Sequence, residues 1–154
     1  MGRRQKESIR AVALAVAAYA DRVFLFEGED PSSGELYYRP IGGAIAFGER
    51  AIDTARRVVE RDMSTELIGI RALGVLENIY DHGGYRQHEI CFVFAGAFAD
   101  RQVYEHDTVE LTEGDQVVAL GGWQTLGSLD APGAPAVLPK GLLAMLRSHH
   151  KAGA

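Results

Sequence analysis

The chain lacks several features on which small proteins often depend. Its 154 residues contain one cysteine, Cys91, so neither a disulfide framework nor a zinc site of paired cysteines is available. Only three residues are lysine, whereas thirteen are arginine. Arginine is suited to bidentate contact with an anionic ligand, but a codon bias of the genome explains the ratio equally well. The net charge of -5 argues against general attraction to phosphate backbones, so we expect no nucleic-acid partner.

Long apolar runs are also missing, because none approaches the roughly 20 residues that span a bilayer. We therefore expect a cytoplasmic protein with no membrane partner. The amino terminus imitates a secretion signal, since basic residues precede the apolar run 11–18 and a small-x-small sequence over 18–20. The alternative, favoured by charged residues that crowd the start of the run, is a buried strand over 9–19, followed by a tight turn and a strand over 23–26.

The remaining composition, 47% hydrophobic and 24% charged residues, is typical of one globular domain. Apolar residues that recur every three or four positions predict a helix over 50–63 and another from Pro139 through Leu146. Further strands are expected over 36–39, 70–80, 88–99 and 117–120, and an acidic, exposed segment over 107–115. This pattern predicts a single α+β domain over 9–147, between tails at 1–8 and 148–154.

The segment 43–65 carries the most specific pattern in the chain and reads GAIAFGERAIDTARRVVERDMST. It resembles the Nudix box, G-x5-E-x7-R-E-U-x-E-E-x-G-U, in which U is a bulky apolar residue. Gly43, Glu49 and Arg57 match the first three fixed positions without a gap. Residues 39–42, 73–80 and 88–94 and Trp123 are also similar to Nudix proteins, so the resemblance covers roughly 9–147.

The resemblance implies a fold and an activity. The fold would be a Nudix-type α/β/α sandwich with a mixed β-sheet, one box helix and a C-terminal helix. The family hydrolyses nucleoside diphosphates linked to another moiety. Its box helix presents three carboxylates on one face, and these bind Mg²⁺ or Mn²⁺ as the cofactor, which bridges the pyrophosphate and helps to activate water.

This chain departs from the box at the three carboxylate positions, which hold Val58, Arg61 and Asp62. The charges of Arg61 and Asp62 cancel, so this face of the box helix carries no net charge, whereas three carboxylates would give it three negative charges. A like-charge contact at ~4 Å costs about 4 kcal/mol at an effective dielectric near 20, so Arg61 disfavours a metal ion. The later glycine of the box is replaced by Ser64. We therefore expect the usual Mg or Mn site to be broken.

Two acids of the box remain candidates for catalysis, Glu49 and Asp62. Asp62 is also the remaining candidate metal ligand, together with the carbonyl of Gly43. Each has a structural alternative: Glu49 can hold the loop by pairing with Arg57, and Asp62 can pair with Arg61.

Residues outside the box helix could bind a ligand. Aromatic rings can stack on a base, an arginine can contact phosphate, and a glycine loop allows close approach. The candidate substrate-binding residues are Tyr37, Arg39, Gly42, Gly43 and Tyr80. Acids that could edge a cleft and rebuild a metal site are Glu77, Asp81, Glu89, Glu113 and Asp115.

Two functions remain open. The favoured one is a weak or inactive hydrolase that binds a small nucleotide-like ligand or a partner, because two of the three carboxylates are lost. The alternative is an active Mg- or Mn-dependent pyrophosphohydrolase that uses Asp62 and acids outside the box. The family resemblance also leaves a homodimer open.

Overall fold

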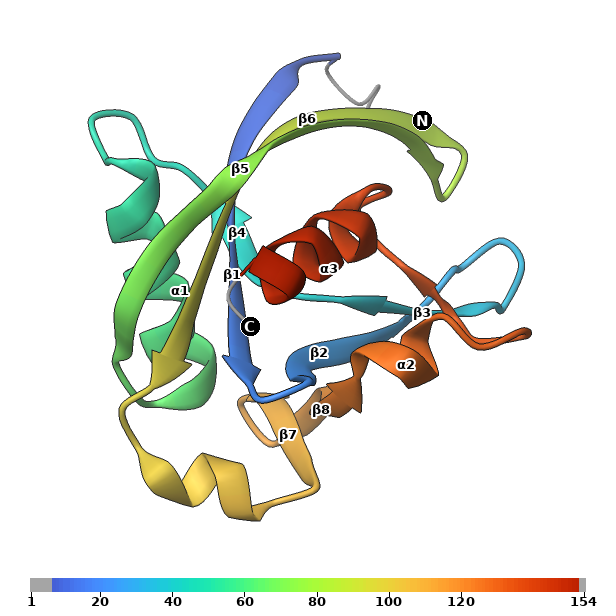
Figure 1. The fold of residues 1–154 in the computed structure, drawn as a ribbon. Helices are drawn as coiled ribbons and strands as arrows, with labels where there is room; N and C mark the ends of the chain where they lie inside the picture. The colour runs from blue at the N-terminus through green and yellow to red at the C-terminus, as the bar shows by residue number, and fades with distance from the viewer. Residues whose placement is uncertain (1–6, 153–154) are drawn as a thin grey trace.

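The computed structural model describes residues 7–152 and contains a mixed β-sheet with helices packed against it (Figure 1). Its strands are β1 (Ile9–Tyr19), β2 (Arg22–Glu29), β3 (Leu36–Arg39), β4 (Ile41–Ala44), β5 (Leu67–His82), β6 (Tyr85–Phe98), β7 (Thr108–Glu113), β8 (Gln116–Thr125) and β9 (Ala136–Val137). Its helices are α1 (Ala51–Met63), the short α2 (Leu126–Leu129) and α3 (Leu142–Ala152), with a 3-10 helix, η1, over Arg101–Glu105.

Strand β1 connects the two parts of the sheet. Strand β6 runs parallel to it along Ile9–Ala17, and β4 pairs antiparallel with Val12–Ala15. Strand β2 joins it only at Ala18 and Tyr19 and then pairs with β3 and β8. The apolar run that imitates a secretion signal therefore lies within a central strand. Strands β5 and β6 form a long hairpin that curves over α3 (Figure 1).

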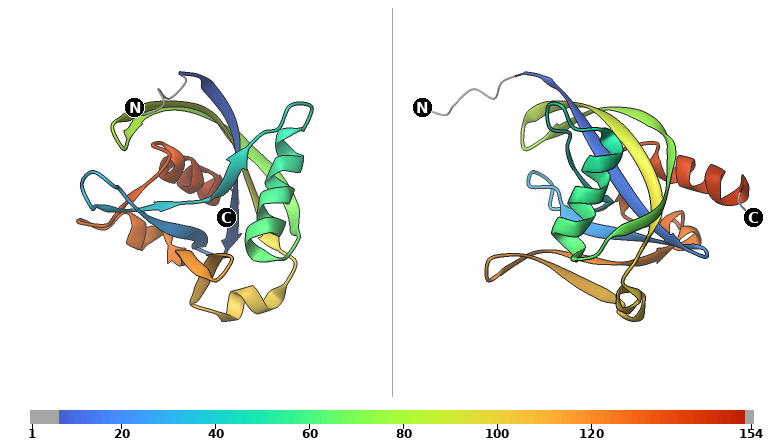
Figure 2. Two further views of the ribbon diagram at one scale, coloured as in Figure 1. Left: turned by 180° about the vertical axis from the view of Figure 1, so that it is seen from behind. Right: turned by 90° about the vertical axis from the view of Figure 1, so that its left-hand side faces the viewer.

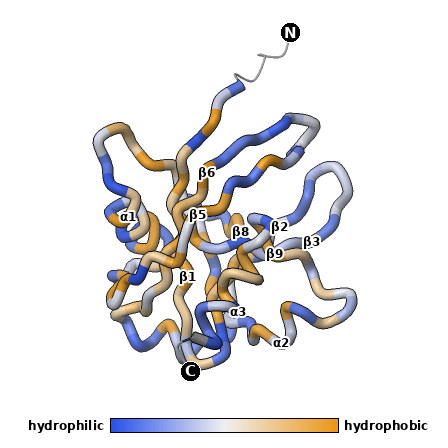
Figure 3. Tube along the Cα trace, turned by 45° about the horizontal axis from the view of Figure 1, so that its top comes forward, coloured by the Kyte–Doolittle hydropathy of each residue, from blue (hydrophilic) through white to orange (hydrophobic). Residues whose placement is uncertain are grey.

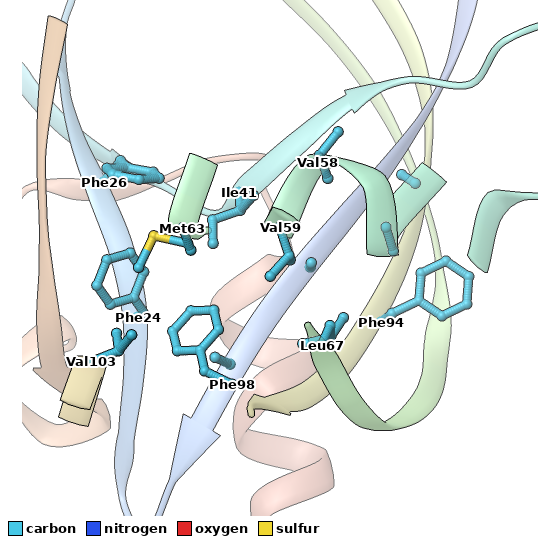
Figure 4. Packing of buried hydrophobic residues seen from close by; sticks show 14 residues of the cluster. Phe24, Phe26, Ile41, Val58, Val59, Met63, Leu67, Phe94, Phe98 and Val103 are labelled. Carbon is cyan, nitrogen blue, oxygen red and sulfur yellow. The ribbon is translucent and has the colours of Figure 1, made fainter. Parts of the chain in front are cut away.

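Alternate residues of β1 belong to two separate cores, as the two-residue period of a strand requires. Ala13, Ala15 and Ala17 are buried with residues of α1, and Figure 4 shows this core around Phe24, Phe98 and Val59. The other core combines the intervening residues of β1 with α3, namely Val12, Leu14, Val16, Leu142 and Leu146. Along the Cα trace, β1 is largely hydrophobic, whereas hydrophilic residues gather in the outer loops (Figure 3).

Helices α1 and α3 consequently lie on opposite faces of the sheet, as the views in Figure 2 also show. The expected α/β/α sandwich with a mixed sheet, one box helix and a C-terminal helix is confirmed. Within the described residues, no helix is both long and apolar enough to cross a membrane.

The acidic segment over 107–115 is largely exposed, as expected, and it contains strand β7, in which Val109 and Leu111 pack against the α1 core while the residues between them face solvent. One expectation needs correction. The expected C-terminal tail at 148–154 is largely helical, since α3 continues to Ala152; residues 153–154 lie outside the described part of the chain. Most of the expected N-terminal tail, residues 1–6, also lies outside it.

The end of α1 explains why the box pattern places a glycine at position 64. Ser64 has φ 54° and ψ 35°, a left-handed conformation, and its N–H donates to the carbonyl of Glu60 at 3.0 Å. Glycine adopts this conformation without the steric cost that a Cβ introduces. The chain therefore keeps the helix end of the box pattern while carrying a less suitable residue there.

Replacing Ser64 with glycine should stabilise the protein. Relief of the left-handed strain outweighs the added freedom of the unfolded chain, which gives a gain of up to about 1 kcal/mol in the free energy of unfolding. Urea denaturation of wild type and Ser64→Gly measures this gain. Ser64→Ala is the matched control, because it keeps the Cβ and should not stabilise; an equal gain in both variants would contradict the explanation.

Candidate functional site

A cleft of about 380 Å³ opens beside the α3 side of β1, between β3, the β5–β6 hairpin and the segment before α3. This volume lies within the range of small-molecule sites. The cleft brings together all five residues expected to bind a ligand, namely Tyr37, Arg39, Gly42, Gly43 and Tyr80. Neither Glu49 nor Asp62 lines it.

Arg39, at the end of β3, supplies a positive charge to the cleft wall. Its guanidinium carbon lies 5.3 Å from the centre of the buried Phe26 ring. The side chain is half-buried and, among residues 7–152, it forms neither an ion pair nor a hydrogen bond. An arginine held over an aromatic ring with free donors is suited to a phosphate or carboxylate group of a ligand.

Tyr37 lies across the backbone of Gly28, its partner on β2. A Cβ at Gly28 would lie 2.4 Å from Cζ of the tyrosine ring, so a larger residue there would displace the ring. The sequence alone does not reveal this dependence, because the pairing of positions 28 and 37 follows from the strand register. Tyr37 thereby lines the cleft, with a ring that can stack on a flat ligand group.

Tyr80 and Arg10 hold the carboxylate of Glu89 in the opposite wall. The side chain of Glu89 is 14% exposed and lies 3.2 Å from a guanidinium nitrogen of Arg10. Burial, the nearby charge of Glu89 and a hydrogen bond to it raise the pKa of Tyr80 to about 12. The phenol therefore stays protonated beside Glu89, whose carboxylate can accept a hydrogen bond from a ligand hydroxyl.

The acids expected at the cleft edge separate into two groups. Asp81 and Glu89 line the cleft, joined by Asp30, which the sequence analysis did not select. Hydrogen bonds from the side chain and backbone of Ser32 lower the pKa of Asp30. Glu77 lies on the other face of the hairpin, where its carboxylate is 3.2 Å from His88.

Glu113 and Asp115 do not line the cleft either; they lie at the end of β7 and in the turn before β8. Within residues 7–152, no three His, Cys, Asp or Glu side chains are placed to hold a metal ion together.

Glu49 and Arg57 form a two-pronged ion pair that fixes the loop before α1. The Nε and Nη2 atoms of Arg57 each donate to one carboxylate oxygen of Glu49 at 2.9 Å. Thr54 adds a hydrogen bond of 2.6 Å to the same carboxylate. With the Arg57 hydrogen bond as the largest cause, these contacts lower the pKa of Glu49 to about 2. The geometry favours a structural role for Glu49, because such a carboxylate is a weak base.

Arg61 lies one helical turn after Arg57, and both arginines donate a hydrogen bond to a backbone carbonyl of β4. The Nη2 of Arg57 donates to the carbonyl of Ala44 at 3.1 Å, and the Nη2 of Arg61 donates to that of Gly42 at 3.3 Å. Four helix residues rise about 6 Å and two strand residues span about 6.6 Å, so the two spacings match. Both arginines thus cover the free edge of β4, which pairs only with β1.

Both carboxylate oxygens of Asp62 accept hydrogen bonds from the guanidinium of Arg61. Its Oδ1 accepts from Nε of Arg61 at 2.7 Å and its Oδ2 accepts from Nη2 at 3.1 Å, while its side chain is 6% exposed. This pair is the alternative that the sequence left open for Asp62. The carboxylate expected to bind a metal therefore already binds a cation that belongs to the chain.

Val58, at the first carboxylate position of the box, is fully buried in the α1 core. A Cβ at Gly43 would lie 2.7 Å from its Cγ1, so helix and glycine pack directly against each other. The Mg or Mn site of the box therefore does not fit the residues present: Val58 provides no ligand, Arg61 is a cation, and Asp62 is already hydrogen-bonded to Arg61. The carbonyl expected to join Asp62 was that of Gly43, but Gly43 pairs with Ala13 of β1, and the carbonyl beside Asp62 and Arg61 is that of Gly42.

Replacing Glu49 with glutamine should destabilise the protein at about pH 6 but not in acid. A carboxyl group whose pKa falls from 4.5 to about 2 on folding stabilises the native state above pH 4.5. That contribution is lost as the pH falls from about 4.5 to about 2, so the two proteins should converge there. Urea denaturation across this range measures the difference in the free energy of unfolding.

Glu60→Gln on the same helix is the control, since the exposed Glu60 side chain has no hydrogen-bond or ion-pair partner within residues 7–152. A difference between wild type and Glu49→Gln that stays constant down to about pH 2 would contradict the role of this ion pair.

Comparison with known proteins agrees with this architecture. No family model and no curated protein matches the sequence. Among solved structures, a MutT Nudix hydrolase from Burkholderia pseudomallei matches with a TM-score of 0.65 and 21% identity, covering 91% of this chain and 98% of that chain. A Nudix hydrolase from Nitrosomonas europaea matches with a TM-score of 0.62 and 17% identity over 95% and 90% of the two chains.

An ADP compounds hydrolase also matches, with a TM-score of 0.62 and 15% identity, over 94% of this chain and 75% of that chain. These identities are too low to transfer an activity, but the likeness covers nearly the whole chain. The α/β/α layers, the loop and helix of the box and the solved structures agree: this chain has the fold of the Nudix hydrolases.

Proposed function

We propose that this chain binds a small nucleotide-like anion in the cleft and does not depend on a metal ion held by the box helix. The observation that carries the proposal is Arg39, a half-buried guanidinium in the cleft without a partner among the described residues. In a chain with 21 acidic and 16 basic residues, an unpaired cation at this place marks a site for negative charge.

The rest of the cleft is suited to the other parts of such a ligand. Tyr37 and Tyr80 offer aromatic rings, and the carboxylate of Glu89 offers an acceptor for hydroxyl groups. The cleft thus has a positive wall at Arg39 and acceptors near the hairpin tip. A ligand with an anionic group at one end and hydroxyl groups at the other would match both.

Hydrolysis through Asp62 and acids outside the box has less support. The Asp62 carboxylate is nearly buried and bound to Arg61 through both oxygens. Of the acids that could rebuild the site, Glu89 faces the cleft but is paired with Arg10, and Glu77 lies on the opposite face of the hairpin. These carboxylates do not converge on one point, which two-metal or single-metal hydrolysis would require.

Calorimetric titration with ADP, ATP and ADP-ribose, each with excess EDTA and with excess Mg²⁺ or Mn²⁺, tests the proposal. At least one ligand should bind equally well in all three conditions. Arg39→Ala should weaken that binding by about tenfold, because a charge-assisted hydrogen bond is lost. Arg56→Ala is the matched control, since Arg56 pairs with Asp53 on the exposed side of α1 and should leave affinity unchanged.

Product analysis in the same mixtures separates the alternative. Metal-dependent turnover on the order of 1 s⁻¹ that disappears in Asp62→Ala would show an active hydrolase and overturn the proposal. So would the absence of binding by all three nucleotides.

A further inference from the structure

The guanidinium of Arg61 occupies a defined position beside the cleft. Two of its nitrogens, Nε and Nη2, are held by Asp62, and Nη2 also donates to the carbonyl of Gly42. Gly42 itself lines the cleft. The cation is therefore one hydrogen bond away from the cleft wall, and its position is fixed by both carboxylate oxygens and a backbone carbonyl.

The third nitrogen remains available. Nη1 lies 3.7 Å from the position that a Cβ on Gly43 would take, and it forms no hydrogen bond with any residue among 7–152. The side chain as a whole is 53% exposed. The same Cβ direction of Gly43 meets Val58, so Nη1 lies on the α1 side of Gly43, a residue that also lines the cleft.

The charge of Arg61 is balanced by Asp62, and that of Arg57 by Glu49. The carboxylate of Glu113 also lies close enough to act on the Arg61 charge. Arg39, which lines the cleft, has no ion-pair partner among the described residues. A phosphate that reaches Nη1 of Arg61 would meet a free donor of a planar guanidinium fork whose position is already fixed.

We propose that Arg61 is a built-in cation that takes the place of the box metal and binds a phosphate group of the ligand directly. Asp62 and the Gly42 carbonyl, oxygen donors that would otherwise suit a divalent cation, position the guanidinium. No bond is made or broken in this role. The inference rests on the proposed function for the nucleotide but also predicts binding of pyrophosphate alone.

The alternative role of Arg61 is structural, as a cover for the edge of β4. The variants must therefore separate ligand binding from folding. Arg61→Gln alone would leave the nearly buried Asp62 carboxylate without its partner, which is costly. The double variant Arg61→Gln with Asp62→Asn avoids this, since two neutral amides can still bond to each other and to Gly42.

Calorimetry with inorganic pyrophosphate, ADP and adenosine, all in excess EDTA, tests the role of Arg61. Wild type should bind pyrophosphate and ADP, and the double variant should bind both about tenfold more weakly. Adenosine, which lacks phosphate, should bind the two proteins equally. Arg56→Gln on the exposed side of α1 is the matched control and should behave as wild type.

A charge reversal provides the second measurement. Arg61→Glu should lose affinity for pyrophosphate in EDTA and recover it with Mg²⁺ or Mn²⁺, because a metal ion bound to two neighbouring carboxylates replaces the guanidinium. Circular dichroism and thermal unfolding establish that each variant is folded. A folded double variant that binds pyrophosphate as wild type does, or an Arg61→Glu protein that shows no recovery with metal, would overturn the inference.

The outcomes also separate this inference from the proposed function. Binding of pyrophosphate that depends on Arg61, without binding of any nucleotide, would reject the proposed function and support the built-in cation. Nucleotide binding that depends on Arg39 but is unchanged in the folded double variant would support the proposed function and reject the role of Arg61.

Discussion

Two arginines one helical turn apart, Arg57 and Arg61, hold the free edge of β4 against α1. They satisfy the carbonyls of Ala44 and Gly42, which β4 leaves unpaired on the side away from β1. Each arginine is in turn fixed by a carboxylate, at Glu49 or Asp62. This arrangement sets the position of Gly42 and Gly43 and therefore of the wall that the cleft shares with the box loop.

The same arrangement explains how the chain keeps the fold without the three carboxylates of the box. Carboxylates that hold a metal ion contribute to the native state only when the ion is bound, because they otherwise repel one another. Here Val58 packs against Gly43, and Arg61 neutralises Asp62 within the chain. The box helix is attached to the loop by apolar packing and internal ion pairs, so its position does not depend on a metal ion.

The sequence predicted the parts of the molecule that depend on local pattern. The period of apolar residues identified α1, and alternation with turn residues identified β1, β2 and the β5–β6 hairpin. It did not reveal β7, where two half-buried residues lie among acids, or the extent of α3, whose last residues are mostly polar. Tyr37, Arg39 and Gly42, which the sequence offers as ligand-binding candidates, line one cleft because β3 and β4 follow each other directly along the chain. The contacts of Arg10 and Gly28 depend on strand register, which a single sequence does not reveal.

Under the proposed function, the acidic surplus of the chain makes the cleft selective. A net charge of -5 repels anions at long range, so an anion binds only where cations are locally unpaired. Among the described residues, most arginines near this site are neutralised, including Arg10 by Glu89 and Arg57 by Glu49. Arg39 is not neutralised, and Arg61 keeps one nitrogen free although its charge is balanced. Attraction to these arginines is therefore short-ranged and directional, which favours a small anionic ligand over an extended polyanion.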